Sequence, residues 1–86
     1  MEMTKEEIYV MFTEVLAEHF DIKGEQVHMR ARLVADFDLD SLDRIALGAE
    51  IEEQSGIALE EKDVRDCETL GDLINHFAVR ISGRAP

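Results

Sequence analysis

Apolar residues recur at helical spacing near the start of the chain. Thr4 and Glu7 have the spacing of a capping box, in which each side chain accepts a hydrogen bond from the other residue's backbone N–H. Behind this box, one face of the predicted helix carries Ile8, Met11, Phe12, Val15, Leu16, His19 and Phe20. The pattern predicts a helix over about residues 4–20.

Two further helices are predicted from the same kind of evidence. Asp40 is a good N-cap and Gly56 can supply the left-handed residue that ends a helix, so the second helix should run from Asp40 to about Gln54. The last helix should open at Thr69, with Asp72 three residues on. Its apolar face comprises Leu70, Leu73, Ile74, Phe77 and Ile81.

The segments between these helices lack a long apolar period. From Asp21 to Asp40 only scattered apolar residues can pin the chain to a core: Ile22, Val27, Leu33, Phe37 and Leu39. We expect a long ordered loop there, an extended Ile57–Leu59 and at most a short helix within Glu60–Asp66. The expected fold is all-α: a four-helix bundle of three longer helices and one short helix, with a long loop between helices one and two.

Length and composition favour one small folded domain over residues 1–86, with its core at about 4–81 and a frayed tail at 82–86. The chain has 20 acidic and 9 basic residues and a formal net charge of −11. This charge argues against a nucleic-acid binder, because phosphate contacts need clustered Lys and Arg. Basic protein surfaces are the expected partners.

Cys67 is the only cysteine, so no intrachain disulfide can form, and the residues around it lack the spacing of a zinc site. The sequence shows neither a signal peptide nor an apolar stretch long enough to cross a membrane. We therefore expect a cytoplasmic, monomeric protein without a transmembrane segment.

A serine among four aspartates, Ser41 in DFDLDSLD (residues 36–43), is the main candidate for chemistry. A nucleophilic serine needs a neighbouring base, but His19 and His76 lie beside predicted core positions, and His28 lies in the loop. No GxSxG motif surrounds Ser41, and the aspartates oppose further negative charge on its oxygen. The pattern disfavours a hydrolase.

The aspartates also resemble the start of an EF-hand. Asp36, Asp38 and Asp40 reproduce its first three alternating calcium ligands. Two later positions depart from the motif, because the sixth should be Gly and is Ser41, and the twelfth should be Glu and is Leu47. We assign no metal ligands, although weak divalent-ion binding stays open.

Ser41 is expected just after the N-cap of a helix. There, free N–H groups and the helix dipole would tolerate a phosphate ester on its hydroxyl. The neighbouring carboxylates would repel that phosphate and attract a basic enzyme instead. A small acidic domain that offers a serine fits a substrate better than a catalyst; the alternative is an ordinary serine in an acidic helix cap.

Three motifs resemble the acyl carrier protein family. Asp40-Ser41-Leu42-Asp43 is similar to the family's Asp-Ser-Leu attachment motif. IEEQSGIAL (51–59) is similar to its Leu-Glu-Glu stretch followed by Phe-Gly-Ile-x-Ile, and ETLGDL (68–73) to its Thr-Val-Gly-Asp-Leu opening of the last helix. In organisation, the resemblance covers about residues 4–81.

The resemblance implies a non-catalytic carrier protein. Its Ser41 would bear 4'-phosphopantetheine, transferred from coenzyme A by a phosphopantetheinyl transferase. The arm's thiol would hold acyl groups as thioesters for fatty-acid, specialised lipid or polyketide synthesis. Cys67 is not that thiol, and we expect it to be a small buried residue.

By the same resemblance, helix two has an inward side with Leu47 and Ile51, and an apolar stripe of Leu42, Ile45 and Ala49 that acyl-loading and acyl-processing enzymes touch. Core packing of Leu42 and Ile45 is the alternative. Acids at partner-facing positions would steer enzymes with basic docking surfaces, against the alternative of a solvated helix face; they are Asp40, Asp43, Glu52 and Glu53.

Three positions depart from the family pattern. Ala46 stands where many relatives have an acid, Arg44 adds a positive charge, and Ser55 replaces a usual core aromatic. Unless Phe37 or Phe77 fills the space, Ser55 would leave the core under-packed. Two other functions stay open: a D-alanyl or aminoacyl carrier, and an acidic helical interaction module that is never modified.

Overall fold

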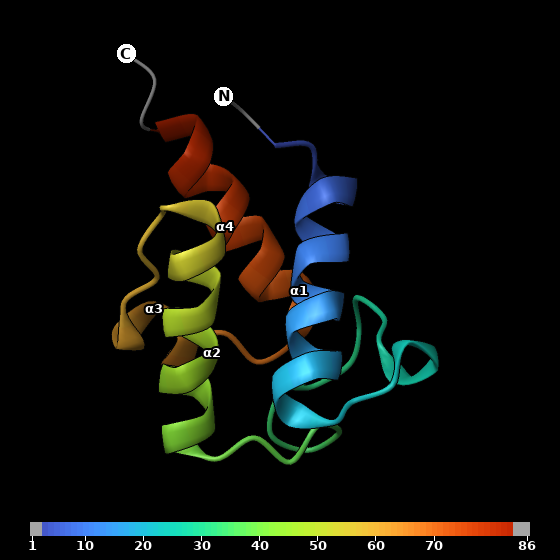
Figure 1. The fold of residues 1–86 in the computed structure, drawn as a ribbon. Coiled ribbons are helices and arrows are strands. Elements are labelled where there is room, and N and C mark those ends of the chain that lie inside the picture. Colours follow the sequence, from blue (N-terminus) through green and yellow to red (C-terminus); the bar gives the residue numbers. More distant parts are fainter. Residues whose placement is uncertain (1–2, 84–86) are drawn as a thin grey trace.

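Four α-helices form the regular structure of residues 3–83, the part of the chain that the computed structural model describes (Figure 1). Helix α1 spans Lys5–Phe20, α2 Ser41–Ser55, α3 Glu61–Arg65 and α4 Leu70–Gly83. A 3-10 turn, η1, spans Gly24–Gln26 in the long loop after α1. Three long helices and one short helix confirm the predicted all-α fold class.

The helix ends follow the capping signals of the sequence. The Thr4–Glu7 capping box is present, with Thr4 N donating to Glu7 Oε1 at 2.8 Å and Glu7 N donating to Thr4 Oγ1 at 3.1 Å. Gly56 ends α2 in the left-handed conformation, with a φ of 75°. At the other end, α4 continues to Gly83, so the expected tail at 82–86 is wrong for its first two residues. Residues 84–86 lie outside the described part.

The core lies between α1, α2 and α4, as the apolar patterns predicted. Each of the five loop residues expected to pin the chain is buried, together with the predicted face of α4 and most of that of α1. Phe12 of α1 and Phe77 of α4 pack edge-to-face, with ring centroids 5.7 Å apart. His19 is an exception to the predicted face of α1, because its side chain is exposed and reaches Glu50 of α2.

The long loop is ordered by hydrogen bonds to the start of α4. The first N–H groups of a helix have no partner within the helix. Here, Leu70 N donates to Ala31 O and Gly71 N donates to Met29 O, both at 2.8 Å. Leu33 N donates in turn to Glu68 O at 2.9 Å. The long loop is therefore held in place by backbone hydrogen bonds to the start of α4 and the residue Glu68 before it.

Gly71 permits this close approach. A Cβ at position 71 would lie 2.8 Å from Met29 O, a distance that real Cβ atoms essentially never show. A second glycine, Gly48 of α2, faces the chain before α3, where a Cβ would lie 3.3 Å from Leu59 O. Both glycines let backbone pack directly against backbone.

Ser55 forms hydrogen bonds at the end of α2. Its Oγ donates to Ile51 O at 2.6 Å and accepts from Ile57 N at 3.1 Å, which joins the end of α2 to the following segment. Phe77, one of the two residues expected to compensate, is fully buried against Phe12. At position 55, where the family pattern has a core aromatic, this chain thus has a serine that is hydrogen-bonded to the backbone at the end of α2.

Helix α3 is fastened to α4 through Asp63. Its carboxylate accepts from Arg80 Nη1 at 3.2 Å and from Glu60 N at 3.2 Å. His76 Nε2 lies 3.1 Å from the other carboxylate oxygen, although this contact lacks hydrogen-bond geometry. One half-buried acid therefore caps α3 and ties it to two residues of α4.

We predict that Gly71→Ala destabilises the fold by about 1 to 3 kcal/mol, because the new methyl group must push back a carbonyl that is hydrogen-bonded to α4. Urea unfolding followed by circular dichroism measures this change. Gly24→Ala is the matched control, since a Cβ there meets only Thr13 Cγ2 at 4.0 Å. Equal stabilities of the two variants would contradict the packing role of Gly71.

We also predict that Asp72→Asn removes an acid-sensitive part of the stability. Hydrogen bonds from the backbone and side chain of Thr69 hold the pKa of Asp72 below its ordinary value. Its contribution is therefore present above the unfolded pKa of about 3.9 and is lost as the pH falls through the lower folded pKa. The difference in stability between the native protein and Asp72→Asn should be largest near pH 7 and should shrink as the pH falls through the lowered folded pKa; a difference that does not change with pH would oppose this role.

Candidate functional site

Ser41 is the first residue of α2 and is exposed. The two flanking aspartates form a reciprocal capping box, with Asp43 N donating to Asp40 Oδ1 at 2.8 Å and Asp40 N donating to Asp43 Oδ2 at 3.2 Å. Arg44 N donates to Asp40 O at 3.0 Å. These bonds fix the first turn of α2, so Ser41 is presented by a rigid helix start.

The segment before Ser41 alternates between the core and the solvent. Phe37 and Leu39 are buried, whereas Asp36, Asp38 and Asp40 are exposed. Leu39 N donates to Leu33 O at 3.1 Å, and Asp38 adopts the left-handed conformation with a φ of 56°. Two buried anchors therefore set where α2 begins.

The Asp36 carboxylate is paired with Arg32, and within residues 3–83 it is not part of a group of acids that could share a metal ion. Arg32 N donates to Asp36 Oδ2 at 2.7 Å, and the Arg32 guanidinium contacts both carboxylate oxygens at 3.3 Å. This side-chain hydrogen bond lowers the pKa of Asp36 from its ordinary value. Over residues 3–83, the structure gathers no three His, Cys, Asp or Glu side chains into a group that could hold a metal ion.

The described residues place no side-chain hydrogen bond on the Ser41 hydroxyl. Two of the three histidines are paired with acids elsewhere: His19 Nε2 lies 3.2 Å from Glu50 Oε2, and His76 contacts Asp63. His28 is exposed in the loop. The arrangement offers a free hydroxyl and supplies no general base to it.

The exposure of the individual side chains shows which side of α2 faces the solvent. Leu47 and Ile51 are completely buried, as predicted. Leu42 is 74% exposed and Ile45 44% exposed, and Ala49 is exposed beside them, so core packing is wrong for Leu42 and Ile45. These three residues form an accessible apolar stripe that starts next to Ser41.

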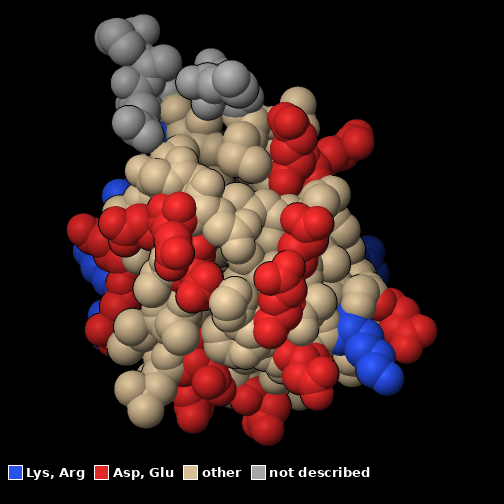
Figure 2. Space-filling view, in the orientation of Figure 1, with Lys and Arg blue, Asp and Glu red and all other residues tan. Residues whose placement is uncertain are grey.

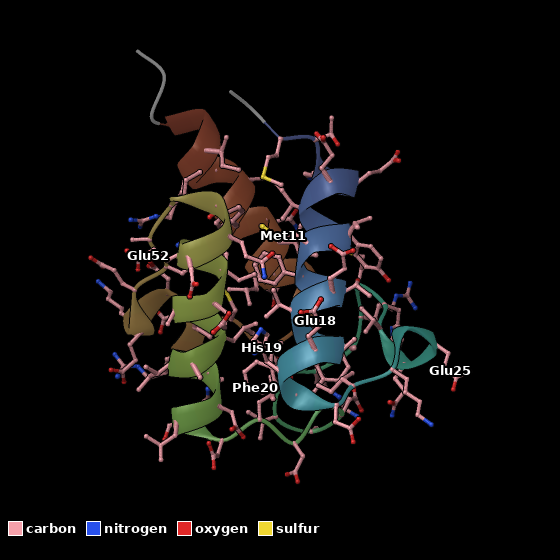
Figure 3. All side chains as sticks on the ribbon, in the orientation of Figure 1. Met11, Glu18, His19, Phe20, Glu25 and Glu52 are labelled. Atoms are coloured by element: carbon pink, nitrogen blue, oxygen red, sulfur yellow. The ribbon has the colours of Figure 1, made fainter. Side chains whose placement is uncertain are left out.

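Acidic side chains surround this stripe. Asp40, Glu52 and Glu53 are exposed, and Asp43 is half-buried. Figure 2 shows acidic groups gathered over α1 and α2, and Figure 3 places Glu52 on the solvent side of α2. The departures also lie on this helix, with Ala46 exposed and Arg44 half-buried. A visiting protein thus meets an apolar stripe with carboxylates at its borders.

An open hollow of about 530 Å³ lies beside the start of α2, between it and the end of α1. Phe20 and Phe37 contribute apolar surface, whereas Asp43 and Glu18 contribute carboxylates. Figure 3 shows Phe20, His19 and Glu18 at this end of α1. The sequence patterns alone did not indicate this hollow, because it forms between segments that are far apart along the chain.

Cys67 is half-buried and packs against the core, which is less burial than expected. Desolvation, followed by the nearby carboxylates of Asp72, Asp63 and Asp66, raises the pKa of its thiol. The neutral thiol is therefore favoured, which disfavours nucleophilic chemistry at this position.

The reciprocal capping of Asp40 and Asp43 was the main feature of the site that sequence reasoning missed. The signal was present, since an acid at the N-cap and another three residues later have capping-box spacing.

No helix within residues 3–83 is both long and apolar enough to span a bilayer.

Comparison with known proteins connects this geometry to a family. The family described as "Phosphopantetheine attachment site" matches residues 12–77. The acyl carrier protein of Thermotoga maritima is 26% identical over 78 residues, covering 91% of this chain and 96% of that protein. The acyl carrier protein of Saccharopolyspora erythraea is 33% identical, covering 84% and 76%.

A third acyl carrier protein is similar as well. Acyl carrier protein MbtL of Mycobacterium sp. (strain MCS) is 36% identical over 69 residues, covering 79% of this chain and 76% of that protein. The matched residues 12–77 include the exposed serine at the start of α2, all of α2, the second part of α1, the first part of α4 and the loop between α1 and α2. The chain therefore belongs to the acyl carrier protein family, whose phosphopantetheine attachment domain it contains.

Proposed function

We propose that the chain carries acyl groups as thioesters on a 4'-phosphopantetheine arm esterified to Ser41. The observation that carries this proposal is the exposed Ser41 hydroxyl on the capped first turn of α2. When bound, the arm supplies the thiol that holds the acyl group. The chain itself supplies an anchor and a docking surface.

The start of α2 suits a phosphate ester in one respect and resists it in another. Ser41 and Leu42 lie in the first turn, where backbone N–H groups lack helical partners and favour an anion. The carboxylates of Asp40 and Asp43 oppose that charge, although each accepts a backbone hydrogen bond in the cap. The attachment is therefore a covalent ester made by an enzyme, rather than capture of a free phosphate.

The base for the attachment reaction must come from the partner. Among the described residues, none hydrogen-bonds the Ser41 hydroxyl through its side chain, and His19 is paired with Glu50. A phosphopantetheinyl transferase would remove the Ser41 proton while the oxygen bonds to phosphorus and the nucleotide part of coenzyme A leaves. This division of labour accounts for a serine without a catalytic neighbour.

The acyl group serves fatty-acid synthesis or a specialised lipid or polyketide pathway in this proposal. Support comes from the relatives, which include two proteins named simply as acyl carrier proteins, a meromycolate extension acyl carrier protein, and MbtL. Ala46 and Arg44 alter the charge of the surface that enzymes would meet, which favours partners adapted to this chain.

Attachment is tested by incubating the protein with coenzyme A and a promiscuous phosphopantetheinyl transferase, followed by intact mass measurement. We expect one added phosphopantetheinyl group on the native chain, none on Ser41→Ala, and one on the control Ser55→Ala, whose serine is half-buried at the other end of α2. An unmodified native chain, or a modified Ser41→Ala variant, would refute the proposal.

Electrostatic steering is tested with Glu53→Lys, because Glu53 is exposed and makes no ion pair within the described residues. Asp43→Lys is less clean, since it also removes half of the capping box. We expect the transferase to associate on the order of three- to tenfold more slowly with Glu53→Lys at low salt, with the difference shrinking as salt is added.

Glu25→Lys is the control for this measurement, because it makes the same charge change on the exposed η1 turn, away from α2 (Figure 3). Stopped-flow association rates at several salt concentrations separate the two variants. Equal slowing by both substitutions would show that net charge, rather than the border of the α2 stripe, governs the encounter.

A further inference from the structure

A second hollow lies at the opposite end of the α1–α2 seam. It has a volume of about 450 Å³ and is more apolar than the hollow beside Ser41. The residues that line it come from the first ten residues of α1, the residue before its N-cap and the end of α2: Met3, Glu6, Glu7, Val10, Met11, Glu14 and Gln54. Val10 is a large apolar side chain with 53% of its surface exposed, and nothing in the bundle covers it.

All the charged residues at the rim of this hollow are acidic. Glu6, Glu7 and Glu14 are exposed, and none of them forms an ion pair with a described residue. Within residues 3–83, no Lys or Arg lines the hollow. Figure 2 shows acidic rows over α1 and α2 with an uncharged strip between them, and Figure 3 shows the Met11 side chain pointing from α1 toward the space between these two helices. Apolar surface bordered by carboxylates that form no ion pair with a described residue complements a segment that is both apolar and basic.

The spacing on α1 defines the shape of such a segment. Glu7, Val10, Met11 and Glu14 occupy positions i, i+3, i+4 and i+7, so they share one face of the helix. The two carboxylates lie about 10 Å apart along the axis, at about 1.5 Å per residue, with the apolar pair between them. A partner helix with two cations seven residues apart and apolar residues at the intervening i+3 and i+4 positions matches this order.

This surface is separate from the one beside Ser41. Gln54 lies 13 residues beyond Ser41, which is about 20 Å along α2. It also points about a third of a turn away from Leu42, toward α1. In Figure 1 the first turn of α1 and the last turn of α2 lie at the end of the bundle opposite to the start of α2. A protein seated here leaves the Ser41 end accessible.

We propose that the Val10 hollow, defined as Val10 and Met11 with the rim of Glu6, Glu7, Glu14 and Gln54, is a second docking surface that binds a basic amphipathic helix of a partner protein. The apolar side chains of that helix cover the exposed Val10 and the edge of Met11, whose side chain is otherwise buried in the core, and its cations pair with Glu7 and Glu14. The partner holds the domain by this end while enzymes act at the other. Only this last clause rests on the proposed attachment to Ser41; the docking itself does not.

The test uses a synthetic helical peptide that repeats Lys-x-x-Leu-Leu-x-x-Lys, titrated into isotopically labelled, unmodified protein. We expect the backbone resonance shifts to centre on Val10, Met11, Glu14 and Gln54. Shifts centred on Leu42 and Ile45, or spread evenly over all acidic residues, would overturn the proposal. A peptide with the leucines replaced by glutamine should bind at least about tenfold more weakly; equal binding would mean general charge attraction and would also overturn it.

Two arginine variants localise the effect. Val10→Arg should weaken peptide binding about tenfold, because it fills the hollow and opposes the peptide's cations. Val79→Arg is the matched control, since Val79 is 68% exposed on α4 and makes the same change outside the hollow. Both positions are exposed, so both variants should keep the native unfolding midpoint. Equal losses of affinity in the two variants would refute the assignment of the surface.

Simultaneous binding is tested separately by measuring the rate of Ser41 modification with saturating peptide present. We expect the rate to stay within about twofold of the rate without peptide, because Gln54 lies about 20 Å from Ser41 along α2 and points to another side of the helix. Strong inhibition would refute the independence of the two surfaces. A chain that binds the peptide at Val10 but is never modified would refute the attachment and leave the docking surface intact, so the two failures are distinguishable.

Discussion

The backbone hydrogen bonds between the long loop and the first turn of α4 are the constraint on which the rest of the structure depends. Leu70 N and Gly71 N need acceptors, and the carbonyls of Ala31 and Met29 provide them. Once these bonds are made, the loop lies across the end of the bundle, and its buried residues, ending with Phe37 and Leu39, fill the core below α1 and α2. The position of Ser41 follows directly from them.

The acids at the start of α2 serve structure and recognition together. Asp40 and Asp43 cap each other's backbone, so their carboxylates hold the turn that presents Ser41. The same carboxylates give this end of the helix its negative charge, which suits the basic enzymes that would have to bring both the arm and the base. Glu52 and Glu53 differ from them, because they are exposed on the helix surface and contribute charge without capping it.

Three sides of α2 have different surroundings. Leu47 and Ile51 face the core, Leu42 and Ile45 face the solvent, and Gly48 admits the backbone of Leu59. A partner can therefore bind α2 on the side of Leu42 and Ile45 without disturbing the residues that pack into the bundle. Helix α3, fastened by Asp63 to Arg80 of α4, closes the side next to Gly48.

The sequence by itself determined the helices, the buried faces of α1 and α4 and the serine, because capping boxes and apolar spacing are local signals: Thr4, Glu7 and Asp40 each act as the pattern predicts. The inward side of α2, with Leu47, followed from the resemblance to the family. It could not decide whether Leu42 and Ile45 are buried, nor that His19 turns to Glu50, because burial depends on which helix lies opposite. The Val10 hollow and the approach of Gly71 to Met29 were likewise decided only by the tertiary structure, since they arise between segments that meet in space and not along the chain.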